Sequence, residues 1–140
     1  MKAFVVAVAA ATVLAAIAAI TAFAGAPARA GQSAVVRVKL SEFGVAAQPK
    51  TVRAGKVTFS ALNNGEVVHE LVVVRQTKGQ LVVKKFKAVE PKNGVAGEIE
   101  DIEPNKTGRL TLTLPAGRYL LICNIVGHYQ LGMREALVVR

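Results

Sequence analysis

The sequence is poor in the residues that form crosslinks and reactive sites. Its 140 residues include one cysteine, two histidines, two methionines and no tryptophan. A single cysteine excludes an internal disulfide, although small exported domains often carry an even number of cysteines as a disulfide framework. An unpaired thiol in an oxidising compartment is a liability unless it is buried, paired with another chain or bound to a ligand. Cys123 is therefore the first residue that needs an explanation.

Basic side chains outnumber acidic ones, but they form no nucleic-acid-binding motif. The chain has 18 Lys and Arg residues against 9 Asp and Glu residues, a net charge of +9. No run of Arg and Lys is interleaved with aromatic residues, so we expect no nucleic-acid partner. The densest basic stretch is predicted as a solvated strand edge with its side chains divided over two faces, and it contains Lys84, Lys85 and Lys87.

Hydrophobic residues, 52% of the sequence, are concentrated near the N-terminus. Residues 3–26 follow Lys2, carry no charge and are mostly Ala, Val and Ile. Ala28-Arg29-Ala30 then supplies the small-residue pattern that a signal peptidase reads. We expect a signal peptide over residues 1–30, or alternatively an uncleaved membrane anchor, because a run of this length could span a bilayer. In both cases residues 31–140 are expected in the periplasm or otherwise outside the cytoplasm.

After the leader, the sequence reads as short strands separated by turns. The predicted strands are rich in β-branched or alternating residues and cover 35–40, 56–62, 69–75, 80–89, 107–114, 118–123 and 134–140. Residues 90–106 are predicted to be irregular, with a short extended piece at 98–102, because they are richer in Pro, Asn, Gly and acidic residues. Seven or eight strands predict one all-β domain over residues 31–140, a Greek-key β-sandwich.

The segment from Cys123 to Met133 carries the strongest functional pattern. It reads Cys-x4-His-x4-Met, with His128 between them, and joins the end of one predicted strand to the start of the next. One loop therefore presents a thiolate, an imidazole and a thioether to a common point. Gly127 and Gly132 directly precede His128 and Met133, where they let the backbone turn each ligand inward. The chance of both offsets arising after the only cysteine is on the order of one in several thousand.

The second histidine supplies a ligand from a distant part of the chain. His69 opens a predicted strand shortly after the Asn63-Asn64-Gly65 turn. Two histidine nitrogens, one thiolate and one weak thioether suit copper in both oxidation states. Zinc prefers a regular tetrahedron without a thioether, and iron–sulfur clusters need more thiolates. We therefore predict one copper ion held by His69, Cys123, His128 and Met133.

These residues resemble those of the cupredoxins, the type 1 or blue copper proteins. The resemblance covers nearly all of residues 31–140 and rests on the Asn-x-Gly turn before His69, the Pro-x-Gly-x-Tyr corner at 115–119 and the ligand loop. The loop spacing is more similar to that of rusticyanin and auracyanin than to that of plastocyanin. The resemblance implies single-electron transfer between Cu(II) and Cu(I) without substrate turnover, so no enzyme activity is expected. Many members carry Asn after the first histidine to tie the ligand regions together, where this chain has Glu70.

A docking surface is predicted around His128. Ile125, Val126, Tyr129 and Leu131 are apolar and are expected to ring this histidine at one end of the sandwich; the alternative is that half of them fold inward. An exposed apolar patch often marks a partner site, so redox partner proteins are expected to dock there. The domain itself is expected to be a monomer, with membrane contact only if the leader stays attached.

Two polar residues near the ligand loop each have two possible structural roles. The hydroxyl of Tyr119 either donates to a nearby carbonyl, as in the tyrosine corner of Greek-key sandwiches, or the ring is simply an inward-facing aromatic. Asn124, which follows Cys123, either bonds across to the His69 region or caps a turn.

Three other functions are compatible with parts of the pattern. A periplasmic copper carrier or chaperone could use the same ligands, but it needs an exchangeable site that is commonly rich in Met and His. A multicopper oxidase or nitrite reductase needs further copper centres and more than two histidines. A metal-free interaction domain would make the ligand spacing a coincidence. The sequence therefore favours electron transfer.

Overall fold

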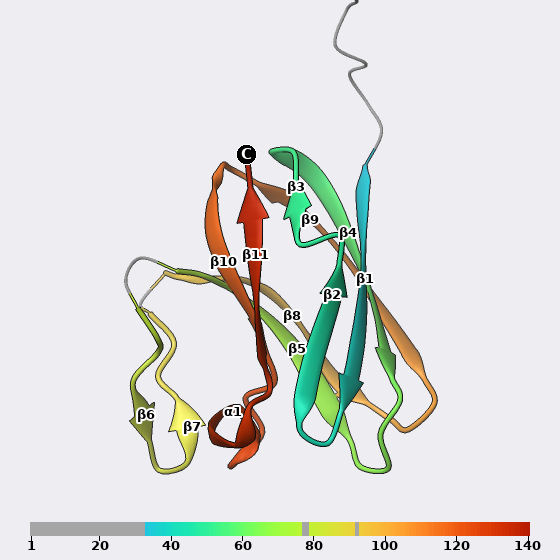
Figure 1. The fold of residues 1–140 in the computed structure, drawn as a ribbon, viewed down its shortest axis with the longest axis vertical. Coiled ribbons are helices and arrows are strands. Elements are labelled where there is room, and N and C mark those ends of the chain that lie inside the picture. The colour runs from blue at the N-terminus through green and yellow to red at the C-terminus, as the bar shows by residue number, and fades with distance from the viewer. Residues whose placement is uncertain (1–32, 77–78, 92) are drawn as a thin grey trace, which may run out of the picture.

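The computed structural model describes residues 33–76, 79–91 and 93–140. The predicted leader, residues 1–30, lies outside these ranges, so its cleavage stays a prediction. Eleven strands and one short helix make up the part of the chain that is described (Figure 1). None of its helices is long and apolar enough to cross a membrane.

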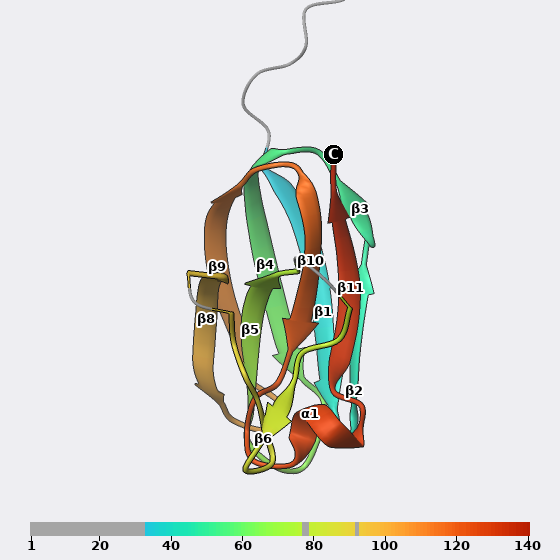
Figure 2. The ribbon, with the colours of Figure 1, turned by 90° about the vertical axis from the view of Figure 1, so that its left-hand side faces the viewer.

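Two sheets pack face to face as a β-sandwich (Figures 1 and 2). The first sheet has the order β2 (Gly44–Gln48), β1 (Ala34–Ser41), β4 (Gly55–Asn63) and β9 (Thr107–Leu114). The second has the order β3 (Thr51–Val52), β11 (Arg134–Val139), β10 (Gly117–Ile122), β5 (His69–Arg75) and β8 (Val95–Ile102). A separate hairpin consists of β6 (Val83–Lys84) and β7 (Lys87–Ala88).

The chain crosses between the sheets several times. It passes from β4 in the first sheet to β5 in the second, returns from β8 to β9, and crosses again from β9 to β10. The last crossing is fixed by Tyr119, whose hydroxyl donates to the carbonyl of Pro115 at 2.9 Å, which confirms the tyrosine corner. Eight strands have five or more residues. The predicted all-β Greek-key sandwich of seven or eight strands is therefore confirmed.

Residue alternation decides what fills the space between the sheets. β1 buries Val36, Val38 and Leu40 and turns the residues between them outward. β4 follows the same rule, with Val57 and Phe59 fully buried against the second sheet. Burying side chains of this size contributes roughly 1.5–3 kcal/mol each to the free energy of folding. This shared cluster therefore holds the two sheets together.

The central strands of the second sheet are buried on both faces. Leu71 and Val73 of β5 point into the space between the sheets, whereas Val72 and Val74 join a second apolar cluster on the outer face. The β6–β7 hairpin and the side chain of Tyr129 cover that outer cluster. The hairpin and α1 (His128–Leu131) lie together at the end opposite the C-terminus (Figures 1 and 2).

The prediction of one continuous strand over residues 80–89 is wrong. The segment forms a tight hairpin in which Lys84 pairs with Lys87. The two turn residues, Lys85 and Phe86, have φ angles of 49° and 63°, as a type I′ turn requires. Residues 80–89 lack the Asn-Gly or Asp-Gly pair that usually signals this turn. All three lysines are exposed on this hairpin.

Two further strand predictions are corrected. β2 was not expected, because its sequence GVAAQ has little intrinsic β propensity; pairing with β1 across a two-residue turn decides its conformation. β8 begins at Val95 and is longer than the extended piece expected at residues 98–102. It pairs along β5 as an edge strand, and this pairing outweighs its glycine and acidic residues.

Candidate metal centre

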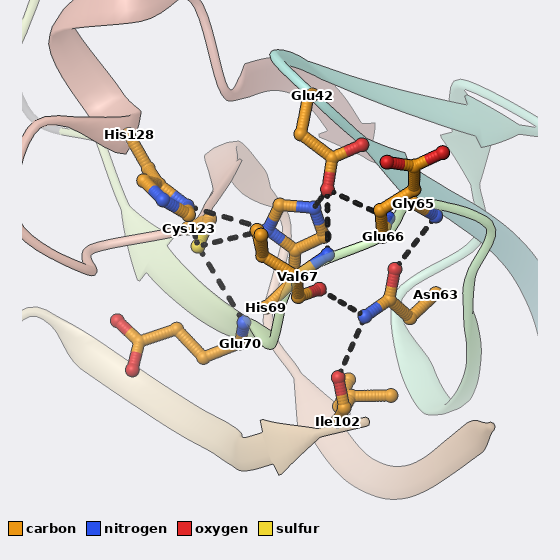
Figure 3. A network of polar contacts seen from close by, with 10 residues as sticks. All are labelled: Glu42, Asn63, Gly65, Glu66, Val67, His69, Glu70, Ile102, Cys123 and His128. Atoms are coloured by element: carbon orange, nitrogen blue, oxygen red, sulfur yellow. Dashed lines mark hydrogen bonds and ion pairs between the residues drawn. The ribbon is translucent and has the colours of Figure 1, made fainter. Parts of the chain in front are cut away.

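His69, Cys123 and His128 converge at one end of the sandwich (Figure 3). One possible ligand atom from each residue lies within 4.8 Å of the others. The Sγ atom of Cys123 is 3.4 Å from Nδ1 of His128 and 4.0 Å from Nδ1 of His69. The two Nδ1 atoms are 3.3 Å apart. The same ring nitrogen of each histidine therefore faces the thiol.

Strand pairing brings His69 and Cys123 together across 54 positions of sequence. His69 is the first residue of β5, and Cys123 directly follows β10. These strands are antiparallel neighbours, with Ile122 opposite Val72, so the start of β5 and the end of β10 meet at one end of the sheet. Both side chains are fully buried there.

The loop after Cys123 contains the single turn of helix α1, which begins at His128. Gly127 and Gly132 bracket this helix with φ angles of 86° and 121°, in the region that favours glycine. The backbone N–H of Met133 donates to the carbonyl of His128 at 3.1 Å, and the N–H of Cys123 donates to the carbonyl of Met133 at 3.2 Å. These bonds hold Met133 beside both ligands, with its side chain fully buried. The helix was not predicted because four residues are too few for periodicity.

The environment of Cys123 favours the neutral thiol in the absence of a cation. Burial raises the pKa of the Cys123 thiol above its ordinary value of 9.0. The backbone N–H of Glu70 opposes this rise by pointing at Sγ, 3.5 Å away, while the Glu70 carboxylate adds to it. A metal ion that binds here must displace the thiol proton, so binding releases a proton at neutral pH.

Glu70 joins the segment that contains His69 to the segment that contains Cys123. Its Oε1 accepts the backbone N–H of Asn124 at 2.8 Å, next to Cys123. Burial raises the pKa of the Glu70 carboxyl, and the hydrogen bond from Asn124 opposes this rise. The predicted link from Asn124 to the His69 region thus exists, but through its backbone.

The side chain of Asn124 instead binds the β6–β7 hairpin to the ligand loop. Its Oδ1 accepts the N–H of Ala88 at 2.7 Å, and its Nδ2 donates to the Ala88 carbonyl at 3.1 Å and to Glu90 Oε1 at 2.8 Å. The N–H of Gly127 also donates to the carbonyl of Phe86 at 2.7 Å. The hairpin therefore supports the loop from outside. This role was not predicted, because residues 80–89 were expected to form one continuous strand.

Asn63 organises the turn before His69. Its side chain is fully buried, and its Oδ1 accepts the N–H of Gly65 at 2.8 Å. Its Nδ2 donates to the carbonyls of Val67 and Ile102, both at 2.7 Å (Figure 3). The turn that the sequence predicts is therefore tied to the end of β8 as well as to itself, which fixes where β5 begins.

The other ring nitrogen of His69 has a partner that sequence reasoning missed. Its Nε2 lies 3.1 Å from Oε1 of Glu42, in the turn between β1 and β2. Backbone hydrogen bonds, first of all from Val67, lower the pKa of the Glu42 carboxyl. No motif marks Glu42, because it is 27 residues from His69 in sequence.

The apolar surface beside His128 differs in part from the predicted one. Val126 and Leu131 are 61% and 59% exposed, as expected. Tyr129 is buried beneath the hairpin, and Ile125 packs against the main core, so the prediction was wrong for these two residues. His128 itself is partly exposed, unlike the other three predicted ligands.

Two phenylalanines from other loops extend this surface. The ring of Phe43 lies 5.5 Å from the His128 ring in an edge contact, and Phe86 lies in the hairpin turn that binds Gly127. Both are largely exposed, at 44% and 65%. The apolar rim of the site thus consists of Phe43, Phe86, Val126 and Leu131.

The fold, a two-sheet sandwich with the donor cluster at one end, is that of the cupredoxins. Auracyanin from Roseiflexus castenholzii is similar at 21% identity over 79% of this chain and 99% of its own, with a TM-score of 0.59. Auracyanin A, a "blue" copper protein from Chloroflexus aurantiacus, is 24% identical over 78% and 100%, with a TM-score of 0.55. Rusticyanin from Thiobacillus ferrooxidans is 18% identical over 78% and 79%, with a TM-score of 0.55. No family model and no curated protein sequence matches the chain.

Proposed function

We propose that this chain is a mononuclear copper protein that carries single electrons between redox partners. The observation that carries the proposal is the convergence of two imidazole nitrogens and one buried thiol within 4.8 Å. This donor set fits copper, because imidazole suits Cu(II) and thiolate suits Cu(I). His69, Cys123 and His128 would hold the ion, with Met133 as a weak fourth ligand. When bound, copper supplies a one-electron couple between Cu(II) and Cu(I).

The surroundings of the ligands favour electron transfer over metal delivery. His69, Cys123 and Met133 are fully buried, and backbone hydrogen bonds join the Cys123 and His128 segments through Met133. A site of this kind resists rearrangement, which suits a change of charge without movement of the ligands. A copper carrier would need ligands that open easily, so we place that function second.

His128 is the proposed exit for the electron. It is the partly exposed ligand, and the apolar rim surrounds it. We propose that redox partner proteins dock on this rim and that the domain works as a monomer outside the cytoplasm; the leader sequence supports the location.

A visible and spin-resonance spectrum of the protein loaded with Cu(II) tests the proposed function. We expect intense colour from sulfur-to-copper charge transfer through Cys123. A copper-loaded protein without colour would contradict the electron-transfer function and leave the carrier as the explanation. Loss of copper to a competing chelator within minutes would have the same meaning.

Replacing Met133 by leucine should retain copper and raise the reduction potential. A thioether is a weak axial ligand whose main effect is to tune the potential. The change nearly conserves side-chain volume in a fully buried position, so the free energy of unfolding should fall by less than about 1.5 kcal/mol. Cyclic voltammetry and metal analysis measure both results. Complete loss of copper would mean that Met133 is a strong ligand and that the proposed geometry is wrong.

Copper affinity should fall more steeply with pH below the ordinary histidine pKa of 6.5 than above it. Metal ligation requires neutral imidazole, so protons compete with the ion. Burial first, and the nearby His69 second, lower the pKa of His128. Above 6.5 the affinity should change with pH only through release of the Cys123 thiol proton, and the fall should steepen as the pH drops through the lowered pKa of His128. Competition with a chromophoric Cu(I) chelator across pH measures this, and a slope that does not steepen in acid would contradict it.

A further inference from the structure

Glu42 places a carboxylate against the side of His69 that faces away from the thiol. It is the first residue of the two-residue turn between β1 and β2. Its Oε1 lies 3.1 Å from His69 Nε2, whereas His69 Nδ1 faces Cys123 (Figure 3). The His69 side chain is fully buried, so this carboxylate is the group that occupies the outer edge of its ring.

The hydrogen bonds around Glu42 decide which nitrogen of His69 carries the proton. The same Oε1 also accepts the backbone N–H groups of Glu66 at 2.9 Å and Val67 at 3.0 Å. An ionised carboxylate only accepts hydrogen bonds, so His69 must donate from Nε2. Neutral imidazole has one N–H, and Nδ1 is therefore left with its lone pair directed at the thiol.

Gly65 leaves open the space that the Glu42 carboxylate occupies, and we call this space the seat of the carboxylate. A Cβ atom at this position would lie 2.4 Å from Oε1 and 2.6 Å from Oε2 of Glu42. Gly65 does not have a positive φ, so the backbone there does not itself need glycine. The residue leaves space for Glu42, while Asn63 fixes the peptide that forms the seat.

We propose that Glu42 is a positioning residue for the metal ligand His69. It selects the Nε2–H tautomer, fixes the plane of the ring, and adds a negative charge that favours the more highly charged ion. Histidine ligands in metal sites commonly donate their second N–H to such a partner, which raises the basicity of the ligand nitrogen. The inference rests on the proposed function, in which His69 Nδ1 binds copper.

Five variants separate the roles of charge, contact and space. Glu42→Gln keeps an acceptor oxygen but removes the charge, and Glu42→Ala removes both. Gly65→Ala should displace the carboxylate without changing it. The double variant Glu42→Ala with Gly65→Ala has no carboxylate to displace. Glu66→Gln is the matched control, because it removes one exposed charge from the same loop while its backbone N–H is retained.

The first measurement needs no metal. Long-range proton–nitrogen NMR of the metal-free protein reports the tautomer of His69. We expect Nε2–H in the wild type, in Glu42→Gln and in Glu66→Gln, and a mixture of both tautomers in Glu42→Ala and Gly65→Ala. Far-UV circular dichroism confirms that each variant is folded.

The second measurement uses the copper-loaded protein. We expect Glu42→Ala to lower Cu(II) affinity about 10- to 100-fold, the usual effect of losing such a partner. Both Glu42 variants should raise the reduction potential, with Glu42→Gln retaining the wild-type spectrum. As a single substitution, Gly65→Ala should also weaken Cu(II) binding. In the double variant it should add little to the loss of affinity that Glu42→Ala causes.

Each outcome decides the inference. An unchanged tautomer in Glu42→Ala would overturn it, and so would a potential that responds equally to Glu66→Gln and Glu42→Gln. Additive losses from Gly65→Ala and Glu42→Ala would mean that the seat is unrelated to the carboxylate and would also count against it. A wild type that binds no copper would overturn the proposed function, whereas the tautomer in the metal-free protein would still decide the role of Glu42.

Discussion

Replacing Cys123 by serine should remove the visible colour of the copper-loaded protein completely. The colour requires a thiolate bonded to the ion, and Cys123 is the only cysteine in the chain. Serine keeps the size of the side chain but supplies a hydroxyl, which is a poor ligand for Cu(I). The absorption spectrum after addition of Cu(II) measures the loss, and metal analysis reports how much copper remains.

The β-sandwich should survive this substitution. The Sγ atom is fully buried and accepts a weak bond from the Glu70 N–H at 3.5 Å, so a hydroxyl there should cost about 1–3 kcal/mol. Urea unfolding of the metal-free variant and wild type gives the difference in free energy. Colour that persists in the variant would exclude Cys123 as the ligand, and a variant that does not fold would be replaced by Cys123→Ala for the same test.

A negative charge at Val126 should slow electron transfer at least about tenfold, while the spectrum and the potential stay nearly constant. Val126 is 61% exposed on the apolar rim beside His128. Redox encounters bury little surface, so one charge that must be desolvated at their centre weakens docking strongly. Stopped-flow reduction of the oxidised Val126→Asp variant by a soluble c-type cytochrome measures the rate.

Val35→Asp is the matched control for this experiment. Val35 is also exposed, at 45%, but it lies near the start of β1, at the opposite end of the sandwich from α1 (Figure 1). Reversal of Lys84 and Lys85 should have a smaller effect that is mainly seen at low salt, because exposed charges steer association and are screened. A strong effect of the lysine change with none from Val126→Asp would mean that docking is electrostatic and centred on the hairpin.

Local patterns were sufficient for the strands whose alternation is strong. The predicted bounds 69–75 and 107–114 agree with β5 and β9. The type I′ turn at Lys85 and Phe86 could not be predicted, because neither residue favours positive φ by itself. Packing of the hairpin on β5 and β10 stabilises that turn, and such packing has no local signal.

The sequence by itself determined the ligand loop, because Cys123, His128 and Met133 are close in the chain and two glycines mark where its backbone must turn. It also indicated His69, since a strand start after a strong turn is a local property. Only the tertiary structure decided what surrounds these residues. The carboxylate behind His69 comes from the β1–β2 turn, and half of the apolar rim comes from the β1–β2 and β6–β7 turns. Such contacts join segments far apart in sequence, and the packing of the two sheets and of the hairpin brings them together.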